Sequence, residues 1–395
     1  MTNASAARRA KEKETELIAL RRELHRVPEI GGTLPETKKI VCERLSALGI
    51  PFFLDPEDDG VVAEIRGGAG KTIAFRADMD ALHMEEETSV PFRSCHAGQM
   101  HGCGHDAHTA ILLTAAAILQ ENREKLSGTV RLLFQSGEET GTGAKAMLRR
   151  GAPEGVDALC ALHVGDLAGE NHAAGDLIIL PGPVSAGKDK FTITVRGKGT
   201  HSAFPEKGVD PILVAARIVS ACEEISAREL PAGTAAVLSF GSFQAGKDHN
   251  TIPETAVLKG SIRVQDEATR DRVGKRLVEI AENIASAFRA SAEVDLKKGS
   301  RTVMNDPALA AFVARTAAET VGEEKVKTAL SSALMGSDDF ANYAAIVPSV
   351  YYFLHTNNKE KGIVEANHSP RFDLDESVLW EGVAVTVALA EAYLK

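Results

Sequence analysis

The 395-residue sequence lacks the features that mark several classes of protein. No apolar run approaches the roughly 18 residues that a membrane-spanning helix needs. The first 15 residues are polar and charged, without the apolar stretch of a secretory signal. The formal net charge of −10 argues against nucleic acid or an anionic membrane as a partner, because no basic patch offsets it. The sequence also contains no internal repeat and no low-complexity segment.

Cysteine is scarce as well. Five scattered cysteines form an odd count without the spacing of a disulfide framework, which fits a reducing cytoplasm, and we expect a cytoplasmic protein. The hydrophobic share of 44% and the charged share of 25% are those of an ordinary globular protein. A chain of 395 residues exceeds the size at which one hydrophobic core stops growing, so we expect two domains.

Short apolar segments alternate with helical segments in the first part of the chain. The predicted elements are strands at 61–65, 71–76, 129–135 and 158–162 and helices at 11–25, 35–48, 109–120 and 143–150. Short, continuously apolar strands separated by helices predict an α/β fold with a mostly parallel sheet covered on both faces. Residues 67–70 read as a hairpin-like turn between the first two strands.

After residue 186 the pattern changes to alternating strands and amphipathic helices in the order β-α-β-β-α-β. This order predicts an inserted ferredoxin-like α+β domain. We expect a catalytic domain made of residues 1–186 and 298–395, with residues 187–297 as an inserted lid and dimerisation domain. Because such a domain offers an edge strand and a helical face for pairing, we expect a homodimer or a higher homo-oligomer.

Residues 100–108 hold the densest group of metal-ligating side chains. A thiol, three imidazoles and a carboxylate fall within nine residues, with two glycines that free the backbone to turn. Thiolate and imidazole are ligands that zinc, manganese, cobalt and iron accept. More polar side chains follow the predicted strands, at Asp78 and Asp80, at Glu138 and Glu139, and at His163. Open α/β sheets bind ligands beyond the carboxyl ends of their strands, so we expect these side chains to meet at one edge.

Seven motifs resemble, in order and spacing, the dinuclear amidohydrolases of the aminoacylase, hippurate hydrolase and auxin-conjugate hydrolase group. These belong to the superfamily that also contains carboxypeptidase G and peptidase T. The motifs are FRADMDAL at 75–82, HGCGHDAH at 101–108, FQSGEE at 134–139, GTHS at 199–202, NTIP at 250–253, GSDDF at 336–340 and NHSPRF at 367–372. The resemblance covers residues 25–376, nearly the whole chain.

The resemblance implies a role for each matched residue. The implied ligands of two divalent ions, which we expect to be zinc, manganese or cobalt, are Cys103, His105, Glu139, His163 and His368. Glu138 matches the general base, and Asp80 matches a carboxylate that orients the site from behind the ligands. His201 matches a histidine that stabilises the oxyanion, in its own or in a neighbouring subunit. Asn250 and Arg263 match groups that hold the substrate carboxylate, a task that suits a guanidinium.

The implied function is a metal-dependent amidohydrolase that cleaves the amide of an N-acyl amino acid or small conjugate into a carboxylic acid and an amino acid. Metal-bound hydroxide is the expected nucleophile. Three alternatives stay open: a metallo-carboxypeptidase or dipeptidase, a ligand-binding protein on a retired hydrolase scaffold, and a mononuclear structural metal site. The sequence departs from the family pattern at His83, Gly102, 136–137, Asp338 and His355, so the identity of the acyl group and of the amino acid stays open.

Overall fold

The computed structural model describes residues 3–54, 58–166 and 172–395. The chain divides into two compact units. The first contains Met1–Val184, Val303–Leu334 and Asp338–Lys395, and the second contains Ser185–Thr302 and Met335–Ser337. The second unit therefore extends past both ends of the range 187–297 and includes a short return segment. Within the described residues, no helix combines the length and the apolar character needed to cross a membrane.

The first unit is built on a sheet that has eight strands within the described residues, in the order β1-β2-β6-β3-β7-β18-β8-β17. These strands are β1 (Phe52–Leu54), β2 (Val61–Arg66), β3 (Lys71–Asp78), β6 (Gly128–Gln135), β7 (Ala158–Gly165), β8 (Leu177–Ile178), β17 (Val326–Lys327) and β18 (Ser349–His355). The central strands β6, β3, β7 and β18 run parallel, which confirms the predicted α/β class.

The predicted hairpin between β2 and β3 is wrong. Strand β6 lies between them, antiparallel to β2 and parallel to β3. The glycine turn bonds to the segment leading into β6 instead, because Gly67 N–H donates to Gly128 O at 2.9 Å and Gly68 N–H donates to Leu126 O at 2.7 Å. A side chain at Gly67 would collide with Leu126 O, at 2.2 Å from its Cβ. The turn therefore serves close packing against a later segment.

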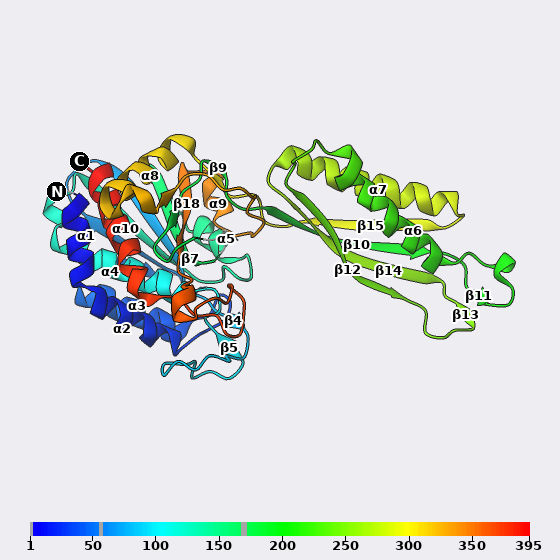
Figure 1. Ribbon diagram of the computed structural model, residues 1–395, viewed down its shortest axis with the longest axis horizontal. Helices are drawn as coiled ribbons and strands as arrows, with labels where there is room; N and C mark the ends of the chain where they lie inside the picture. The colour runs from blue at the N-terminus through cyan, green and yellow to red at the C-terminus, as the bar shows by residue number, and fades with distance from the viewer. Residues whose placement is uncertain (1–2, 55–57, 167–171) are drawn as a thin grey trace. The chain divides into compact units, whose positions relative to one another are not determined.

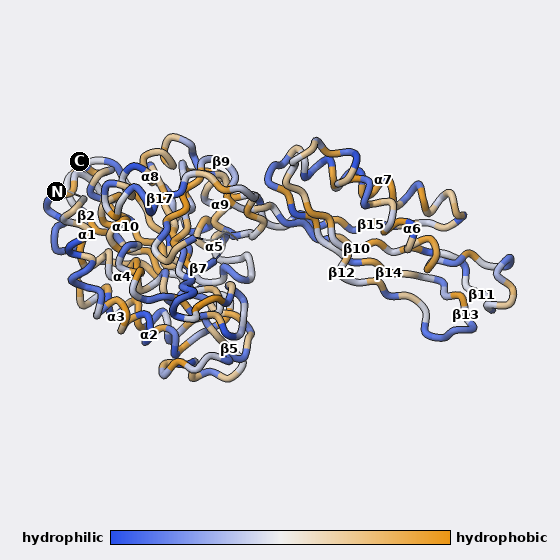
Figure 2. The backbone as a smooth tube through the Cα atoms, in the orientation of Figure 1, coloured by the Kyte–Doolittle hydropathy of each residue, from blue (hydrophilic) through white to orange (hydrophobic). Residues whose placement is uncertain are grey.

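Helices cover both faces of this sheet (Figure 1). On one face lie α1 (Asn3–Glu12), α2 (Glu14–His25), α3 (Pro35–Ala47), α4 (His105–Glu121), α8 (Pro307–Val321) and α10 (Leu379–Tyr393). On the other lie α5 (Gly143–Arg149) and α9 (Ala341–Ala344). Neighbouring residues of β3 point to opposite sides, with Ile73 and Phe75 in one core and Ala74 in the other. Figure 2 shows the hydrophobic residues of this unit gathered toward its interior.

One helix was not predicted, and another begins earlier than predicted. Helix α1 was not predicted, because its buried positions are the alanines Ala6 and Ala10, which carry too little apolar surface to give a helical pattern. Helix α4 begins at His105, four residues before the predicted start. Its polar first turn reads as a loop in the sequence, yet the turn is buried and follows Gly104 in the left-handed conformation, with φ of 89°.

The second unit confirms the ferredoxin-like order. Its antiparallel sheet has four strands in the order β12-β14-β10-β15, and α6 and α7 pack on one face (Figure 1). The described elements are β10 (Gly187–Arg196), α6 (Pro211–Glu224), β12 (Ala236–Ala245), β14 (Thr255–Val264), α7 (Glu267–Ala287) and β15 (Ser291–Lys298). Phe191, Ile193 and Val195 of β10 are buried beneath the helices while the residues between them are not, as period-2 patterning requires.

Short strands pair outside the two large sheets. They are β4 (Leu82–His83) with β5 (Gln99–Met100), β9 (Gly182–Pro183) with β16 (Met304–Asn305), and β11 (Thr200–His201) with β13 (Thr251–Ile252). The β4–β5 pair fixes the entry to the cysteine-containing loop, and β11 carries one of the predicted site residues.

Candidate metal centre

The five predicted ligands come together in the first unit. Three groups that contain these ligands and Glu138 have ligand atoms within 4.8 Å of one another: Cys103 with His105 and His163, Cys103 with Glu139 and His368, and His105 with Glu138 and Glu139. A fourth group joins His105 to Asp78 and His108. Cys103 Sγ lies 3.5 Å from His163 Nε2, and Glu139 Oε1 lies 3.4 Å from His368 Nε2. Four separate chain segments thus supply one cluster: the start of α4 with the loop before it, the turn after β6, the end of β7, and the later segment that carries His368.

Hydrogen bonds fix which nitrogen each buried imidazole offers. His105 Nδ1 donates to Asp80 O at 2.8 Å, and His163 Nδ1 donates to Val164 O at 2.8 Å. When neutral, each ring therefore presents Nε2 as an electron-pair donor. Although burial alone would lower it, Asp78 raises the pKa of His105 well above its usual range, so a cation would have to displace a proton from that ring. Burial, together with the neighbouring His108, holds the pKa of His163 well below its usual range, so this ring is neutral, as a ligand must be.

Two buried atoms in the cluster make no hydrogen bond within the described residues, although each lies at ion-pair distance from a neighbouring side chain. They are His105 Nε2 and Glu139 Oε1, which face each other at 3.9 Å. Buried polar atoms are nearly always paired, so these two indicate a bound group. Burial also raises the pKa of the Cys103 thiol to about 12, and a cation would have to displace that proton to bind the sulfur. The donor set of sulfur, imidazole and carboxylate fits divalent zinc, manganese or cobalt.

Asp80 holds the two glutamates from behind. One carboxylate oxygen accepts the N–H of Glu138 at 2.9 Å, and the other accepts the N–H of Glu139 at 3.1 Å. The turn before them passes through Gly137 at a φ of 68°. Because Asp80 also accepts from His105 through its backbone oxygen, this one residue orients a ligand and the glutamate pair together.

A buried network of ion pairs lies beside Glu138, and it was not predicted from the sequence. Arg76 is fully buried and contacts Asp78 at 2.6 Å, Asp339 at 3.1 Å and Asp338 at 3.3 Å. Glu138, Asp338 and Asp339 form another group of mutually close carboxylates, but the Arg76 guanidinium already supplies a positive charge to its two aspartates. The adjacent acidic residues of GSDDF were a signal for this network, although they gave no hint of their partner.

The acidic neighbours also affect the glutamate assigned as the base. Burial raises the pKa of Glu138 well above its usual range, and Asp338, Asp339 and Glu139 raise it further. The N–H of Asp339 lies 3.4 Å from Glu138 Oε1, which fixes one end of the carboxyl group. A carboxyl group held in this way can accept and retain a proton near neutral pH.

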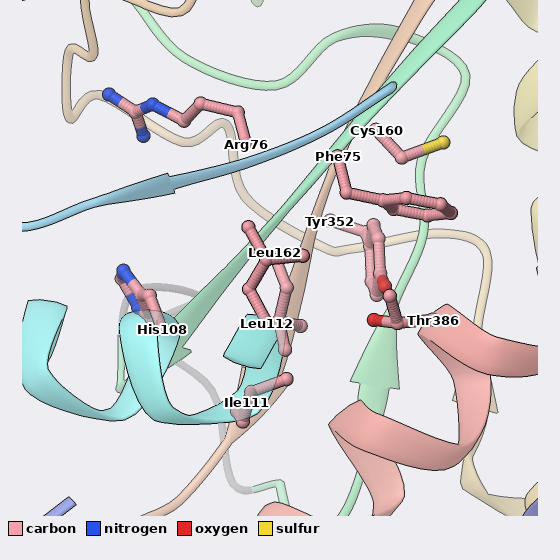
Figure 3. Close-up of a pocket in the computed structure, with 9 residues that line it drawn as sticks. All are labelled: Phe75, Arg76, His108, Ile111, Leu112, Cys160, Leu162, Tyr352 and Thr386. Atoms are coloured by element: carbon pink, nitrogen blue, oxygen red, sulfur yellow. The ribbon is translucent and has the colours of Figure 1, made fainter. Parts of the chain in front are cut away.

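His108 and Asp78 support the ligands. His108 Nε2 accepts the N–H of Val164 at 2.8 Å, so its Nδ1 carries the proton and donates to Asp78 at 2.5 Å. Figure 3 shows His108 at the side of a small pocket. The lining residues are mostly apolar, and none of the five predicted ligands is among them: Phe75, Arg76, His108, Ile111, Leu112, Cys160, Leu162, Tyr352 and Thr386. This pocket belongs to the core behind the cluster.

His368 reaches the cluster on an unusual backbone. It is a non-glycine residue with a left-handed φ of 69°, and its N–H donates to Gly102 O at 2.7 Å. Its side chain is 54% exposed, whereas the other four predicted ligands are mostly or fully buried. Strained backbone persists where surrounding contacts fix it, as it does at functional sites.

The remaining predicted residues lie in the second unit. His201 is on β11, and its Nδ1 accepts the N–H of Ala203 at 3.1 Å. Asn250 is exposed beside β13. Arg263 is on β14, where its Nη1 donates to Met335 O at 2.8 Å.

Comparison with known proteins agrees with this chemistry. Residues 74–392 match the model of peptidase family M20/M25/M40. The chain is 36% identical to N-acetyl-L-cysteine deacetylase of Bacillus subtilis, over 93% of this chain and 85% of that protein. It is 35% identical to thermostable carboxypeptidase 2 of Saccharolobus solfataricus, over 96% of each chain. The crystal structure of Bacillus subtilis YxeP, described as a dinuclear metal-binding peptidase of the M20 family, superposes with a TM-score of 0.85 at 33% identity, covering 97% of this chain and 99% of that one.

These matches cover nearly the full length of both partners, and they confirm the family that the seven motifs predicted. The chain belongs to peptidase family M20/M25/M40 and is a hydrolase of amide bonds.

Proposed function

We propose that this enzyme uses two divalent cations to hydrolyse the amide of an N-acyl amino acid or a small conjugate, releasing a carboxylic acid and an amino acid. The observation that carries the proposal is the pair of buried atoms that make no hydrogen bond, His105 Nε2 and Glu139 Oε1, beside a second glutamate, Glu138. Activity on N-acetyl-L-cysteine, named for a relative at 36% identity, supports the acyl amino acid class.

The ligands in this proposal are Cys103, His105, Glu139, His163 and His368. When bound, the two cations, which we expect to be zinc, manganese or cobalt, polarise the amide carbonyl and lower the pKa of water. The remaining work falls to side chains of the chain itself.

Glu138 moves the proton. It takes a proton from the attacking water, holds it because burial and three acidic neighbours favour the protonated carboxyl group, and gives it to the leaving nitrogen. Asp80 keeps Glu138 in place through its bond to the Glu138 N–H.

His201 supplies a hydrogen-bond donor to the oxyanion. Because its Nδ1 accepts the Ala203 N–H, the neutral ring carries its proton on Nε2, and that N–H can donate to an oxyanion. Asn250 and Arg263 hold the substrate carboxylate. We also propose a homo-oligomer paired through the second unit, in which His201 serves its own or a neighbouring subunit. Sedimentation velocity measures the assembly state.

The test replaces the proposed base. We expect Glu138→Gln to lower kcat by about 100- to 10,000-fold, the usual contribution of a general base, with metal content unchanged. Glu293→Gln, at an exposed position on β15, is the matched control and should keep wild-type kcat. Near-normal turnover by Glu138→Gln would refute the assignment of the base.

The substrate class needs a separate measurement. Acetyl, benzoyl, indoleacetyl and aminobenzoyl amino acids are compared with dipeptides that carry a free amine, each with added zinc, manganese or cobalt. Higher kcat/KM on the acyl compounds supports the proposal, and higher kcat/KM on free dipeptides identifies a carboxypeptidase or dipeptidase instead.

A further inference from the structure

The first turn of α4, which carries the ligand His105, is anchored on three sides. His105 donates to the backbone of Asp80, and His108 donates to Asp78. Asp106 lies between them in the sequence and points away from the cluster toward α2. No part of the proposed chemistry uses this third anchor.

Asp106 is held by an arginine and a histidine of α2. Its Oδ2 accepts from Arg21 Nε at 2.8 Å and from His25 Nδ1 at 2.7 Å. The side chains of Arg21 and Asp106 are both 0% exposed. These two hydrogen bonds fix the position of the carboxylate in the interior.

Arg21 extends this contact to a third segment. Its Nη1 lies 3.3 Å from Glu376 Oε1 and 3.9 Å from Asp373 Oδ1. Those two acids follow the ligand His368 in the same segment. The N–H of His368 also donates to Gly102 O in the loop at residues 100–108, here called the metal loop. One guanidinium thus connects the helix that carries His105 with the segment that carries His368.

A buried ion pair is weak evidence for stability, because removing both charges from water costs about as much as their attraction returns. Such a pair does favour one arrangement over slightly displaced ones, since small shifts lose the charged hydrogen bonds. Because Asp106 is one residue from the proposed ligand His105, we attribute the pair to holding the geometry of the site rather than to stability.

We propose that Arg21, His25 and Asp106 are positioning residues, here called the α2 brace, which set the metal affinity of the centre by fixing His105 and the segment of His368. The inference rests on the proposed metal function. A purely structural alternative is that the pair only attaches α2 to α4.

The test is Asp106→Asn in the full-length enzyme, because asparagine keeps the shape and one acceptor oxygen but loses the charge. The dissociation constant for Co²⁺ is measured by chelator competition, and the sulfur-to-cobalt absorption band of Cys103 reports the geometry. We expect a dissociation constant raised about 10- to 100-fold, the usual effect of losing a partner behind the ligands. The band should shift, and excess Co²⁺ should restore most of kcat.

Asp189→Asn is the matched control. Asp189 is 1% exposed and pairs with the buried Arg270 in the second unit, which supplies none of the five ligands, so it carries the same type of buried pair. We expect this variant to lose thermal stability while its Co²⁺ dissociation constant and absorption band stay at wild-type values.

The outcomes separate the two hypotheses. A folded Asp106→Asn variant with an unchanged dissociation constant and band overturns the brace, as does an equal loss of affinity in Asp189→Asn. If Asp106→Asn does not fold, His25→Leu takes its place, because it leaves the Arg21–Asp106 pair intact, and an unchanged dissociation constant there also overturns the brace. A wild-type enzyme that binds no Co²⁺ refutes the metal function itself, and the brace with it.

Discussion

Asp80→Asn tests how the glutamate pair is held. The carboxylate accepts two backbone N–H groups, one on each oxygen, whereas the amide of asparagine offers one acceptor oxygen and turns an NH₂ group toward the other N–H. Either Glu138 or Glu139 therefore loses its partner. An unsatisfied buried donor costs about 1–3 kcal/mol, and for a protein unit of this size each kcal/mol lowers Tm by roughly 2–4 °C.

The same change should lower activity by more than the loss of stability explains. Since Glu138 and Glu139 share this support, we expect kcat to fall about 10- to 100-fold and metal affinity to weaken by a similar factor. Scanning calorimetry, steady-state kinetics with an acyl amino acid and chelator competition measure the three effects. Asp306→Asn is the control, because Asp306 caps α8 through one bond from Leu309 N–H and asparagine caps equally well.

Wild-type kcat and metal affinity in a folded Asp80→Asn enzyme would contradict the reasoning. They would show that the turn at Gly137 positions the glutamates without help from the carboxylate.

Two further predictions concern the metal loop. Burial lowers the pKa of His101 to about 3, below the value of 6.5 in the unfolded chain. The free energy of unfolding therefore falls as the pH falls from 6.5 toward 3, by about 2 kcal/mol between pH 6.5 and pH 5. The Tm of metal-free His101→Leu should therefore fall less between pH 7 and pH 5 than that of the wild type, and an equal fall contradicts the burial argument. Gly104→Ala should unfold at lower temperature than Gly98→Ala and lose metal affinity. Both glycines have positive φ, but only at Gly104 does an added Cβ collide, with Val164 Cγ2 at 2.4 Å, and equal Tm values would remove that explanation.

Local patterns predicted the parts of the fold that depend on local chemistry. The apolar runs of β3, β6 and β7 indicated a parallel sheet, and the polar residues after them indicated its functional edge. The order of the strands in the sheet could not be predicted from local patterns. The turn at residues 67–70 looks like a hairpin until β6, some 60 residues later, enters between its two strands.

The site likewise contains residues that local patterns predicted and contacts between distant residues that they did not. Cys103, His105, Glu139 and His368 were predicted from motif resemblance, because each lies in a short recognisable sequence. His163 lies in none of the seven motifs and was predicted from its place directly after a strand. The contacts of Arg76 with Asp338 and Asp339 were missed, since these partners are more than 250 residues away and an arginine on an apolar strand gives no sign of what it contacts. The pair of Arg21 and Asp106 was missed because its members lie 85 residues apart on two helices, and neither local pattern indicates the other.

The spread of the ligands along the chain has a consequence for biosynthesis. Ribosomes add about 5–20 residues per second, so roughly 13–53 s pass between the synthesis of Cys103 and that of His368. Throughout that interval the thiol and the first imidazole exist without their last partner. In the proposed site, the full set of ligands is therefore present only after the segment that carries His368 has been synthesised.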